Sequence, residues 1–179
     1  VSGLLDLGLA DVCAHTGAGL VVMHTRTPPK VRREDPALYD DVVADVLTFL
    51  GERMAAAREQ GMREQQFLVD PGPDFAKTPA QTAEVLRRLG ELHALGRPIL
   101  LAASRKDFIG ALTARRPGER LAGTLAAVAE GVDAGAHVLR VHDVRDVVDF
   151  LAVRGVLRGE DAVSEGLLLA RDLRHERPE

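Results

Sequence analysis

Four short apolar runs divide the chain, and each predicts a β-strand. The runs are GLVVMHT at 19–25, QFLVDPG at 66–72, PILLAAS at 98–104 and HVLRVHD at 137–143. In each run apolar residues fall on both faces, which is typical of parallel strands that are buried under helices. The pattern therefore predicts four parallel strands.

Capping residues predict where the helices between these strands begin and end. The first long helix is expected to start after Asp35, with a proline at its first position, and to stop near Gly61. The next is expected to start at the capping box of Thr78 and Gln81 and to end at Gly96. Each helix follows a predicted strand and completes a βα unit.

Three further helices are expected towards the C-terminus. An alanine- and glycine-rich helix covers 119–134, and a helix capped by Asp143 covers 144–154. The tail after Gly159 carries leucines at helical spacing and predicts one more amphipathic helix with a frayed end. The chain also opens on a helical segment before 19–25, so it begins within a βα unit.

A strand followed by a helix, repeated about every 30 to 45 residues, predicts an α/β fold with right-handed crossovers. An open doubly wound sheet and a (β/α)8 TIM barrel both fit this order. Four units are half of a barrel, which needs roughly 250 residues. We therefore expect residues 1–179 to form the C-terminal half of one barrel domain, with the first half outside this sequence.

Composition excludes several partners. The 179 residues include 23 Lys and Arg against 27 Asp and Glu, and the basic residues are scattered, so nucleic acid is not expected. Cys13 is the single cysteine, which fits a reducing cytoplasm. No apolar run reaches the roughly 18 residues of a membrane span. The six histidines show no metal-ligand spacing, so no metal site is expected in this chain.

Polar side chains gather where the predicted strands end. In either α/β architecture ligands bind outside the carboxyl ends of the strands. One carboxylate among several cations predicts a pocket that binds an aminopyrimidine-like edge at the acid and an anion at the bases. The residues are Met23, His24 and Arg26, then Asp70, then Ser104, Arg105 and Lys106, and finally Arg140, His142 and Asp143.

Several of these residues have simpler interpretations. Asp70 can begin a turn before the proline and glycine that follow it, and Phe75 can belong to the core. Ser104 fits a helix N-cap as well as a ligand contact, and Lys106 can be a solvated surface charge. These alternatives stay open on residue type alone.

Arg140 and His142 are harder to assign to a structural role. An arginine that faces inward at a buried strand end needs an anion, and a residue two positions on points the same way. His15, His24 and His137 are interpreted as structural.

Four segments together resemble dihydropteroate synthases, which belong to the pterin-binding barrel family. They are LVDPGPDFAKT, AASRKDFIG, ERLAGTLAAVA and LRVHDV, in this order and spacing. VVMHTRTPP also resembles that family's M-H-M-R-G-x-P loop. The likeness covers about residues 1–155 and agrees with the C-terminal half of the barrel.

The resemblance implies a transferase of folate biosynthesis. The amine of p-aminobenzoate attacks the methylene of 6-hydroxymethyl-dihydropterin pyrophosphate, and pyrophosphate leaves. It also implies a Mg²⁺ ion on the pyrophosphate, whose protein ligand lies outside this chain, and a homodimer built by the last helices.

The resemblance also assigns roles to residues. Asp70 is expected to accept hydrogen bonds from the pterin edge, and Lys106 to donate to the pterin beside the incoming amine. Arg140 and His142 are expected to hold the departing pyrophosphate. The other substrate-binding residues that it implies are Met23, Phe75, Ser104 and Arg105.

The chain departs from the family's pattern at several positions. Asp74, Ala76 and Ala102 replace glycines, and Asp107 replaces a serine. We expect Asp74 to place a second carboxylate beside Asp70, and Asp107 to be the third residue of a helix capped by Ser104. Two alternatives follow: a synthase-like homologue with lost or changed activity that binds a pterin or phosphate ligand, and a methyltetrahydrofolate-dependent methyltransferase.

Overall fold

The computed structural model describes residues 4, 6–28, 31 and 33–174. They fall into two units, Val1–Asp143 and Val144–Glu179. The first unit contains every strand and most of the helices, and the second contains one long helix and the tail.

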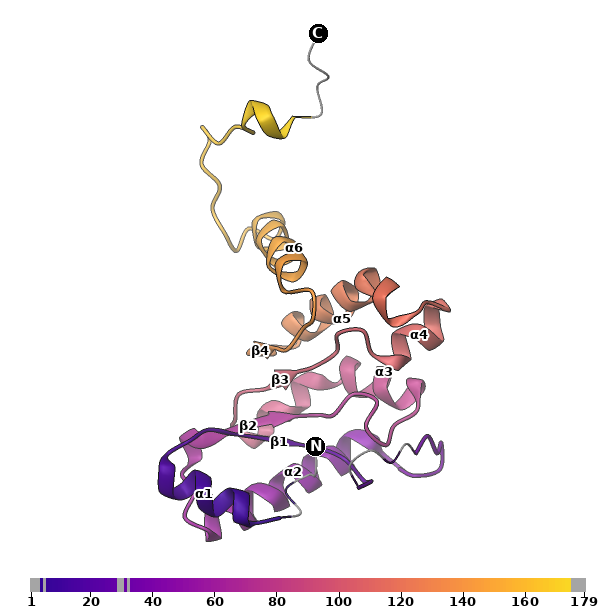
Figure 1. The fold of residues 1–179 in the computed structure, drawn as a ribbon, viewed down its shortest axis with the longest axis vertical. Coiled ribbons are helices and arrows are strands. Elements are labelled where there is room, and N and C mark those ends of the chain that lie inside the picture. The colour runs from indigo at the N-terminus through magenta and orange to yellow at the C-terminus, as the bar shows by residue number, and fades with distance from the viewer. Residues whose placement is uncertain (1–3, 5, 29–30, 32, 175–179) are drawn as a thin grey trace. The chain divides into compact units, whose positions relative to one another are not determined.

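The strands of the first unit are all parallel and follow one another in chain order (Figure 1). β1 pairs with β2 and β3 pairs with β4, while a single parallel bridge between Val69 and Ile99 links the two pairs. This is the arrangement predicted from consecutive βα units, and it brings the carboxyl ends of the strands to one edge. The strands are β1 (Leu20–Met23), β2 (Phe67–Asp70), β3 (Leu100–Leu101) and β4 (Val138–Leu139).

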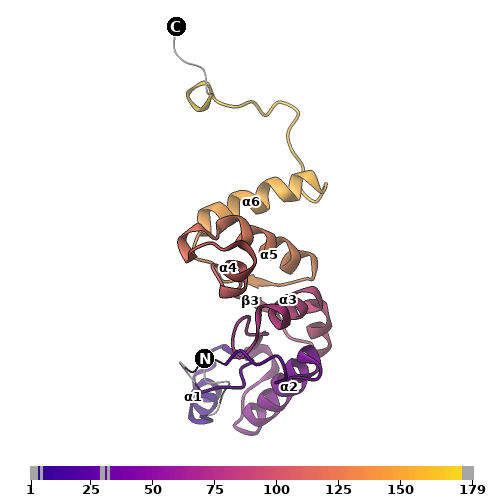
Figure 2. The same ribbon diagram turned by 90° about the vertical axis from the view of Figure 1, so that its right-hand side faces the viewer.

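Helices precede and connect these strands. α2 and α3 lie side by side in both ribbon views (Figures 1 and 2). The α-helices of the first unit are α1 (Gly8–Thr16), α2 (Val42–Glu59), α3 (Pro79–Arg87), α4 (Asp107–Thr113) and α5 (Leu121–Asp133). Short 3-10 helices are η1 (Glu64–Gln66), η2 (Leu89–Leu95) and η3 (Pro117–Glu119).

The core of the first unit lies between its strands and helices. Val43 and Leu50 of α2, Val69 of β2, Val85 of α3 and Ile99 before β3 are all completely buried. Burying one such side chain stabilises a fold by about 1.5–3 kcal/mol. The core therefore fixes the strands from which the loops of the candidate site extend.

Two of the predicted helices are confirmed with changed ends. Thr78 and Gln81 form the expected capping box at the start of α3, but the α-helix stops at Arg87 and continues as η2, before Gly96 at a φ of 63°. The helix predicted at 119–134 is α5.

The prediction that α2 starts after Asp35 is wrong. The helix begins at Val42, and the carboxylate of Asp41 accepts the N–H groups of two first-turn residues at 2.8 and 3.0 Å. The carbonyl of Asp35 instead accepts a hydrogen bond from the Gln81 side chain at 3.2 Å. This contact with the start of α3 holds the segment around Asp35 outside the helix.

The second unit contains α6 (Val144–Leu157), which confirms the helix predicted at 144–154. The amphipathic helix predicted after Gly159 is wrong, because the described tail forms only η4 (Arg171–Leu173). Leu168 is 80% exposed, and a short helix without packing partners is marginal in water. Among the described residues, no helix is long and apolar enough to cross a membrane.

The capping box of α3 predicts a measurable contribution to stability. Thr78→Ala removes the side-chain oxygen that accepts from the backbone N–H of Gln81 at 3.2 Å. We expect the free energy of unfolding in urea to fall by about 1 kcal/mol. Thr78→Ser keeps the acceptor and is expected to stay close to the unchanged protein; equal losses in both variants would contradict the assignment.

Candidate functional site

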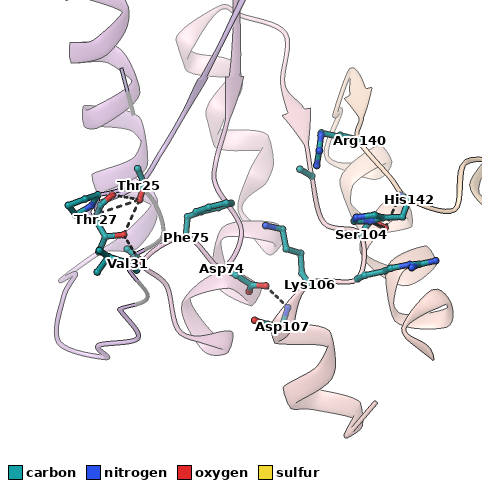
Figure 3. A pocket seen from close by; sticks show the side chains of 14 residues that line it. Thr25, Thr27, Val31, Asp74, Phe75, Ser104, Lys106, Asp107, Arg140 and His142 are labelled. Carbon is teal, nitrogen blue, oxygen red and sulfur yellow. Dashed lines mark hydrogen bonds between the residues drawn. The ribbon is translucent and has the colours of Figure 1, made fainter. Parts of the chain in front are cut away.

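A cavity of about 420 Å³ opens where the strands of the first unit end. Figure 3 shows Thr25, Thr27 and Val31 on one side of it and Arg140 and His142 on the other. Residues after β2 and β3 form the wall between these two sides. Loops that follow all four strands therefore contribute to a single cavity, as expected at this edge of parallel strands.

Six of the eight predicted site residues line this cavity. They are Phe75, Ser104, Arg105, Lys106, Arg140 and His142. Met23 and Asp70, the other two, lie opposite each other in register at the ends of β1 and β2 and are not part of its lining.

Asp70 is buried at the end of β2, and its Oδ1 atom accepts the N–H of Gly72 at 2.8 Å. It therefore makes the turn contact that its sequence neighbours suggest. Burial raises the pKa of the Asp70 carboxyl, while the hydrogen bond from Gly72 and the positive charge of Lys106 act in the opposite direction. Asp70 is thus an acid with cations close by, behind the lining of the cavity.

Gly72 lets the first two strand loops come close together. Its φ is 65°, and a Cβ at this position would lie 2.1 Å from the carbonyl oxygen of His24. A side chain at this position is therefore disfavoured by the backbone conformation and excluded by the contact.

Lys106 is partly buried, which excludes the interpretation as a solvated surface charge. Its Nζ donates to the carbonyl of Pro73 at 2.9 Å and lies 4.4 Å from the centroid of the Phe75 ring. Burial lowers the pKa of the Lys106 ammonium, and the charges of Asp74 and Asp70 partly offset this effect. The same contact makes Phe75 a wall of the cavity instead of a core residue.

Ser104 orients His142. The Ser104 hydroxyl accepts the backbone N–H of His142 at 3.2 Å and lies 3.0 Å from its ring Nδ1. The hydroxyl can donate to Nδ1 or accept from it, and in either case the contact fixes the position of the ring. Ser104 is not the N-cap of α4, which was one of its expected roles, because Lys106 occupies that position.

Arg140 is exposed in the wall of the cavity, so the expectation that burial forces it to find an anion is wrong. Among the described residues none accepts a hydrogen bond from its guanidinium. Arg105 differs, because its guanidinium is bonded to the carboxylate of Asp143, with Nε 3.0 Å from Oδ2. This bond lowers the pKa of Asp143 and joins the loop after β3 to the end of β4.

Asp74 does not present its carboxylate beside Asp70 as expected. Its Oδ2 accepts the backbone N–H of Asp107 at 2.6 Å, at the first residue of α4 (Figure 3). Asp107 is thus the first helical residue and not the third. Asp74 and Ala76 both have positive φ, at 65° and 51°, in the region that favours glycine.

Sequence reasoning did not predict a polar chain that runs from buried Lys77 and His24 to half-buried Asp45 and exposed Arg26. Lys77 is 1% exposed, and its Nζ contacts His24 Nδ1 at 2.7 Å and donates to the carbonyls of Gly72 at 3.1 Å and residue 75 at 3.3 Å. His24 Nε2 contacts Asp45 Oδ2 at 2.8 Å, and Arg26 Nε donates to the same oxygen at 2.9 Å. Nothing in the local sequence around Lys77 marks it as buried.

Burial shifts two pKa values in this polar chain. Burial lowers the pKa of Lys77 to about 7 and that of His24 to about 3. His24 is therefore neutral, accepts from Lys77 at Nδ1 and donates to Asp45 from Nε2. Its interpretation as a structural histidine agrees with this position.

The sequence profile of the pterin binding enzymes matches residues 1–142. The chain belongs to the pterin binding enzyme family. Its sequence is 37% identical to the dihydropteroate synthase of Escherichia coli K12 over 153 residues, which are 86% of this chain and 54% of that relative. It is 34% identical to the enzyme of Bacillus subtilis over 161 residues, 90% of this chain and 54% of that one. The chain spans about half the length of these curated relatives.

Solved structures of this family have the same fold. Dihydropteroate synthase from Stenotrophomonas maltophilia, with imidazole in its active site, matches with a TM-score of 0.84 and 39% identity over 90% of this chain and 61% of that one. The enzyme from Xanthomonas albilineans with 4-aminobenzoic acid matches with a TM-score of 0.79 and 40% identity over 88% of this chain and 56% of that one. These neighbours are TIM barrels, so the predicted fold class is confirmed and the chain forms part of such a barrel.

The described residues of this pterin binding enzyme contain no group of three or more His, Cys, Asp or Glu side chains that could hold a metal ion. They do not fit a Mg²⁺ site by themselves.

Gly72 predicts a strong and specific sensitivity to substitution. Gly72→Ala adds a Cβ that collides with the His24 carbonyl, whereas Gly96→Ala adds one at a similar φ with nothing within 4 Å. For Gly96→Ala we expect a loss of about 1–2 kcal/mol from the left-handed backbone alone. Urea unfolding is expected to show a clearly larger loss for Gly72→Ala; similar losses in the two variants would contradict the close approach.

The neutral His24 predicts a loss of stability in acid. Its pKa falls from 6.5 to about 3 on folding, so below pH 6.5 the unfolded chain takes up a proton that the folded chain refuses. Stability is expected to fall from pH 6.5 towards 3, by at most about 1.4 kcal/mol per pH unit from this group. The free energy of unfolding of His24→Gln should lack this component, whereas His15→Gln, at an exposed histidine, should keep it.

Proposed function

We propose that this chain supplies part of the active site of a dihydropteroate synthase, which joins p-aminobenzoate to 6-hydroxymethyl-dihydropterin pyrophosphate in folate biosynthesis. The observation that carries the proposal is the gathering of Lys106, Arg140 and His142 around one cavity with Phe75 in its wall. Solved relatives support the choice of ligands. The Thermus thermophilus enzyme was crystallised with 6HMPPP, and the Xanthomonas albilineans enzyme with 7,8-dihydropteroate.

Arg140 and His142 are the groups proposed to stabilise the leaving pyrophosphate. The C–N bond forms while the C–O bond breaks, the electron pair leaves with pyrophosphate, and the amine loses a proton to solvent. Negative charge therefore grows on the leaving oxygen, where a guanidinium and the Nε2–H of His142 can donate to it. The bond between Ser104 and His142 Nδ1 supports this assignment, because it holds the ring in place and leaves Nε2 for the substrate.

Lys106 and Phe75 are proposed to hold the aromatic amine and the pterin. The Phe75 ring offers a flat apolar wall, and the ammonium has three N–H groups, of which the described residues accept one. Asp70 is proposed to recognise the donor edge of the pterin. Met23 lies opposite it in register and is proposed to contact the ring, while Ser104 borders the aminobenzoate.

Arg105 is proposed to act on substrate through the loop that it holds, because its guanidinium is engaged by Asp143. A Mg²⁺ ion that bridges the pyrophosphate is proposed to have its protein ligand outside this chain. We also propose that residues 1–179 belong to one barrel domain of a cytoplasmic homodimer. Exposed Val148, Val153 and Leu157 on α6 offer apolar surface for a second subunit.

Turnover by the natural protein that carries this sequence tests the proposal. We expect release of pyrophosphate and formation of dihydropteroate from the two substrates. Arg140→Ala and His142→Asn are each expected to lower kcat by about 100-fold or more, since each removes a donor to the developing charge. The control is Arg145→Ala, whose side chain is 93% exposed on α6 and should leave turnover unchanged.

Other results would assign another function. Calorimetric binding of pyrophosphate without turnover would indicate a synthase-like homologue that binds a phosphate ligand. Methyl transfer from methyltetrahydrofolate would indicate a methyltransferase of the same family. Either result contradicts the synthase proposal.

A further inference from the structure

We infer that Asp74 is a positioning residue, which joins the loop after β2 to the start of α4 and so fixes where Lys106 presents its ammonium in the cavity. The connection to catalysis rests on the proposed function, because there Lys106 contacts substrate. The mechanical part of the inference stands on the geometry alone.

The start of α4 needs an acceptor from another part of the chain. Its first N–H groups have no partner within the helix, and the residue at the N-cap position is Lys106, whose side chain can only donate. Asp74 supplies that acceptor from a loop 33 residues earlier: Oδ2 lies 2.6 Å from Asp107 N, and Oδ1 lies 3.3 Å from Phe108 N. A carboxylate at this position also opposes the positive end of the helix dipole.

The Asp74 carboxylate is itself held in place by α3. The hydroxyl of Thr82 accepts the backbone N–H of Asp74 at 3.1 Å and donates to Oδ1 at 3.2 Å. Thr82 is completely buried. The carboxylate therefore connects α3 with α4. Its bond with α3 fixes the orientation in which it accepts from the N–H groups of α4.

The same loop receives the Lys106 side chain. Lys106 Nζ donates to Pro73, next to Asp74, and lies over the ring of Phe75 on the other side of Asp74. The backbone that follows Lys106 is thus bonded to the loop through Asp74, and its ammonium is bonded to the loop through Pro73. These two hydrogen bonds restrict the conformations of the lysine side chain. Such restriction preorganises a group that contacts a substrate.

The Asp74 carboxylate also acts on the charge of Lys106. The charged groups that face Lys106 are Asp74, Asp70 and Asp107, which favour the ammonium, and Arg140, which opposes it. Burial lowers the pKa of Lys106, and among these charges Asp74 raises that pKa the most. Asp107 has a second partner, because Arg120 Nη1 donates to its carboxylate at 2.9 Å. Neutralising Asp74 is therefore expected to lower the pKa of Lys106.

Two substitutions separate the charge of Asp74 from its hydrogen bonds. Asp74→Asn keeps a side-chain oxygen that can accept from α4 and removes the charge, whereas Asp74→Ala removes both. In the natural protein, the rate of Lys106 acylation by acetic anhydride is measured by mass spectrometry across pH. Acylation needs the neutral amine, so we expect the midpoint of the pH profile to move to lower pH in Asp74→Asn.

Hydrogen exchange at the amides of residues 107 and 108 reports the helix cap. We expect exchange about fivefold faster in Asp74→Ala, corresponding to a lost cap, and close to unchanged in Asp74→Asn. Thr82→Val removes the hydroxyl that orients the carboxylate and is expected to accelerate the same amides. Asp172→Asn, at an exposed residue of the tail, is the control for loss of one negative charge and should change neither readout.

The inference is overturned if Asp74→Asn leaves the acylation profile of Lys106 in place, or if Asp74→Ala and Thr82→Val leave amide exchange at 107 and 108 unchanged. Should Asp74→Ala fail to fold, the other two variants decide the question. In turnover, we expect the alkaline limb of the kcat/KM profile of Asp74→Asn to move to lower pH. Absence of any turnover in the unsubstituted protein would remove the proposed function, while acylation and exchange would still decide the role of Asp74.

Discussion

Lys77 places an amino group inside the fold, and the geometry of the candidate site depends on how that group is hydrogen-bonded. Its Nζ contacts His24, after β1, and two carbonyls of the loop after β2, at Gly72 and residue 75. An unpartnered buried polar group is costly, so these bonds are made together or the loops separate. The close approach of Gly72 to the His24 carbonyl belongs to the same arrangement. The wall that carries Phe75 is thereby fixed before any ligand arrives.

A second set of hydrogen bonds connects the loop after β2 to the loops that follow the remaining strands. Asp74 joins the loop after β2 to α4, and Arg105 joins the loop after β3 to Asp143 beyond β4. Ser104 then orients His142. Each loop of the cavity is therefore connected to the next by at least one side chain that forms a hydrogen bond with the backbone or with a charged side chain. The loops at the ends of the parallel strands are thus hydrogen-bonded in series. A displacement of one loop is therefore expected to displace the others.

The sequence was sufficient for features that depend on local pattern. Apolar runs predicted the strands and their order, and six of the eight predicted site residues did meet in one cavity. The sequence was insufficient where several local structures were possible and a contact with a distant part of the chain determines which one forms. Asp35 and Asp41 are both good caps, and the choice depends on Gln81 of another helix. The roles of Asp74 and Lys77 depend on partners 33 and 53 residues away along the chain, so no local pattern could reveal them.

The bond between Ser104 and His142 has a consequence for ligand selectivity. It occupies Nδ1 of the imidazole and leaves Nε2 for a ligand, next to an ammonium at Lys106 and a guanidinium at Arg140, which can only donate. This side of the cavity consequently distinguishes ligands that offer hydrogen-bond acceptors from ligands that offer donors, in addition to selecting by charge. A compound that directs carbonyl, carboxylate or phosphoryl oxygens at Lys106 and Arg140 finds donors there, whereas an isosteric compound with amino groups at the same places sets donors against donors and is rejected.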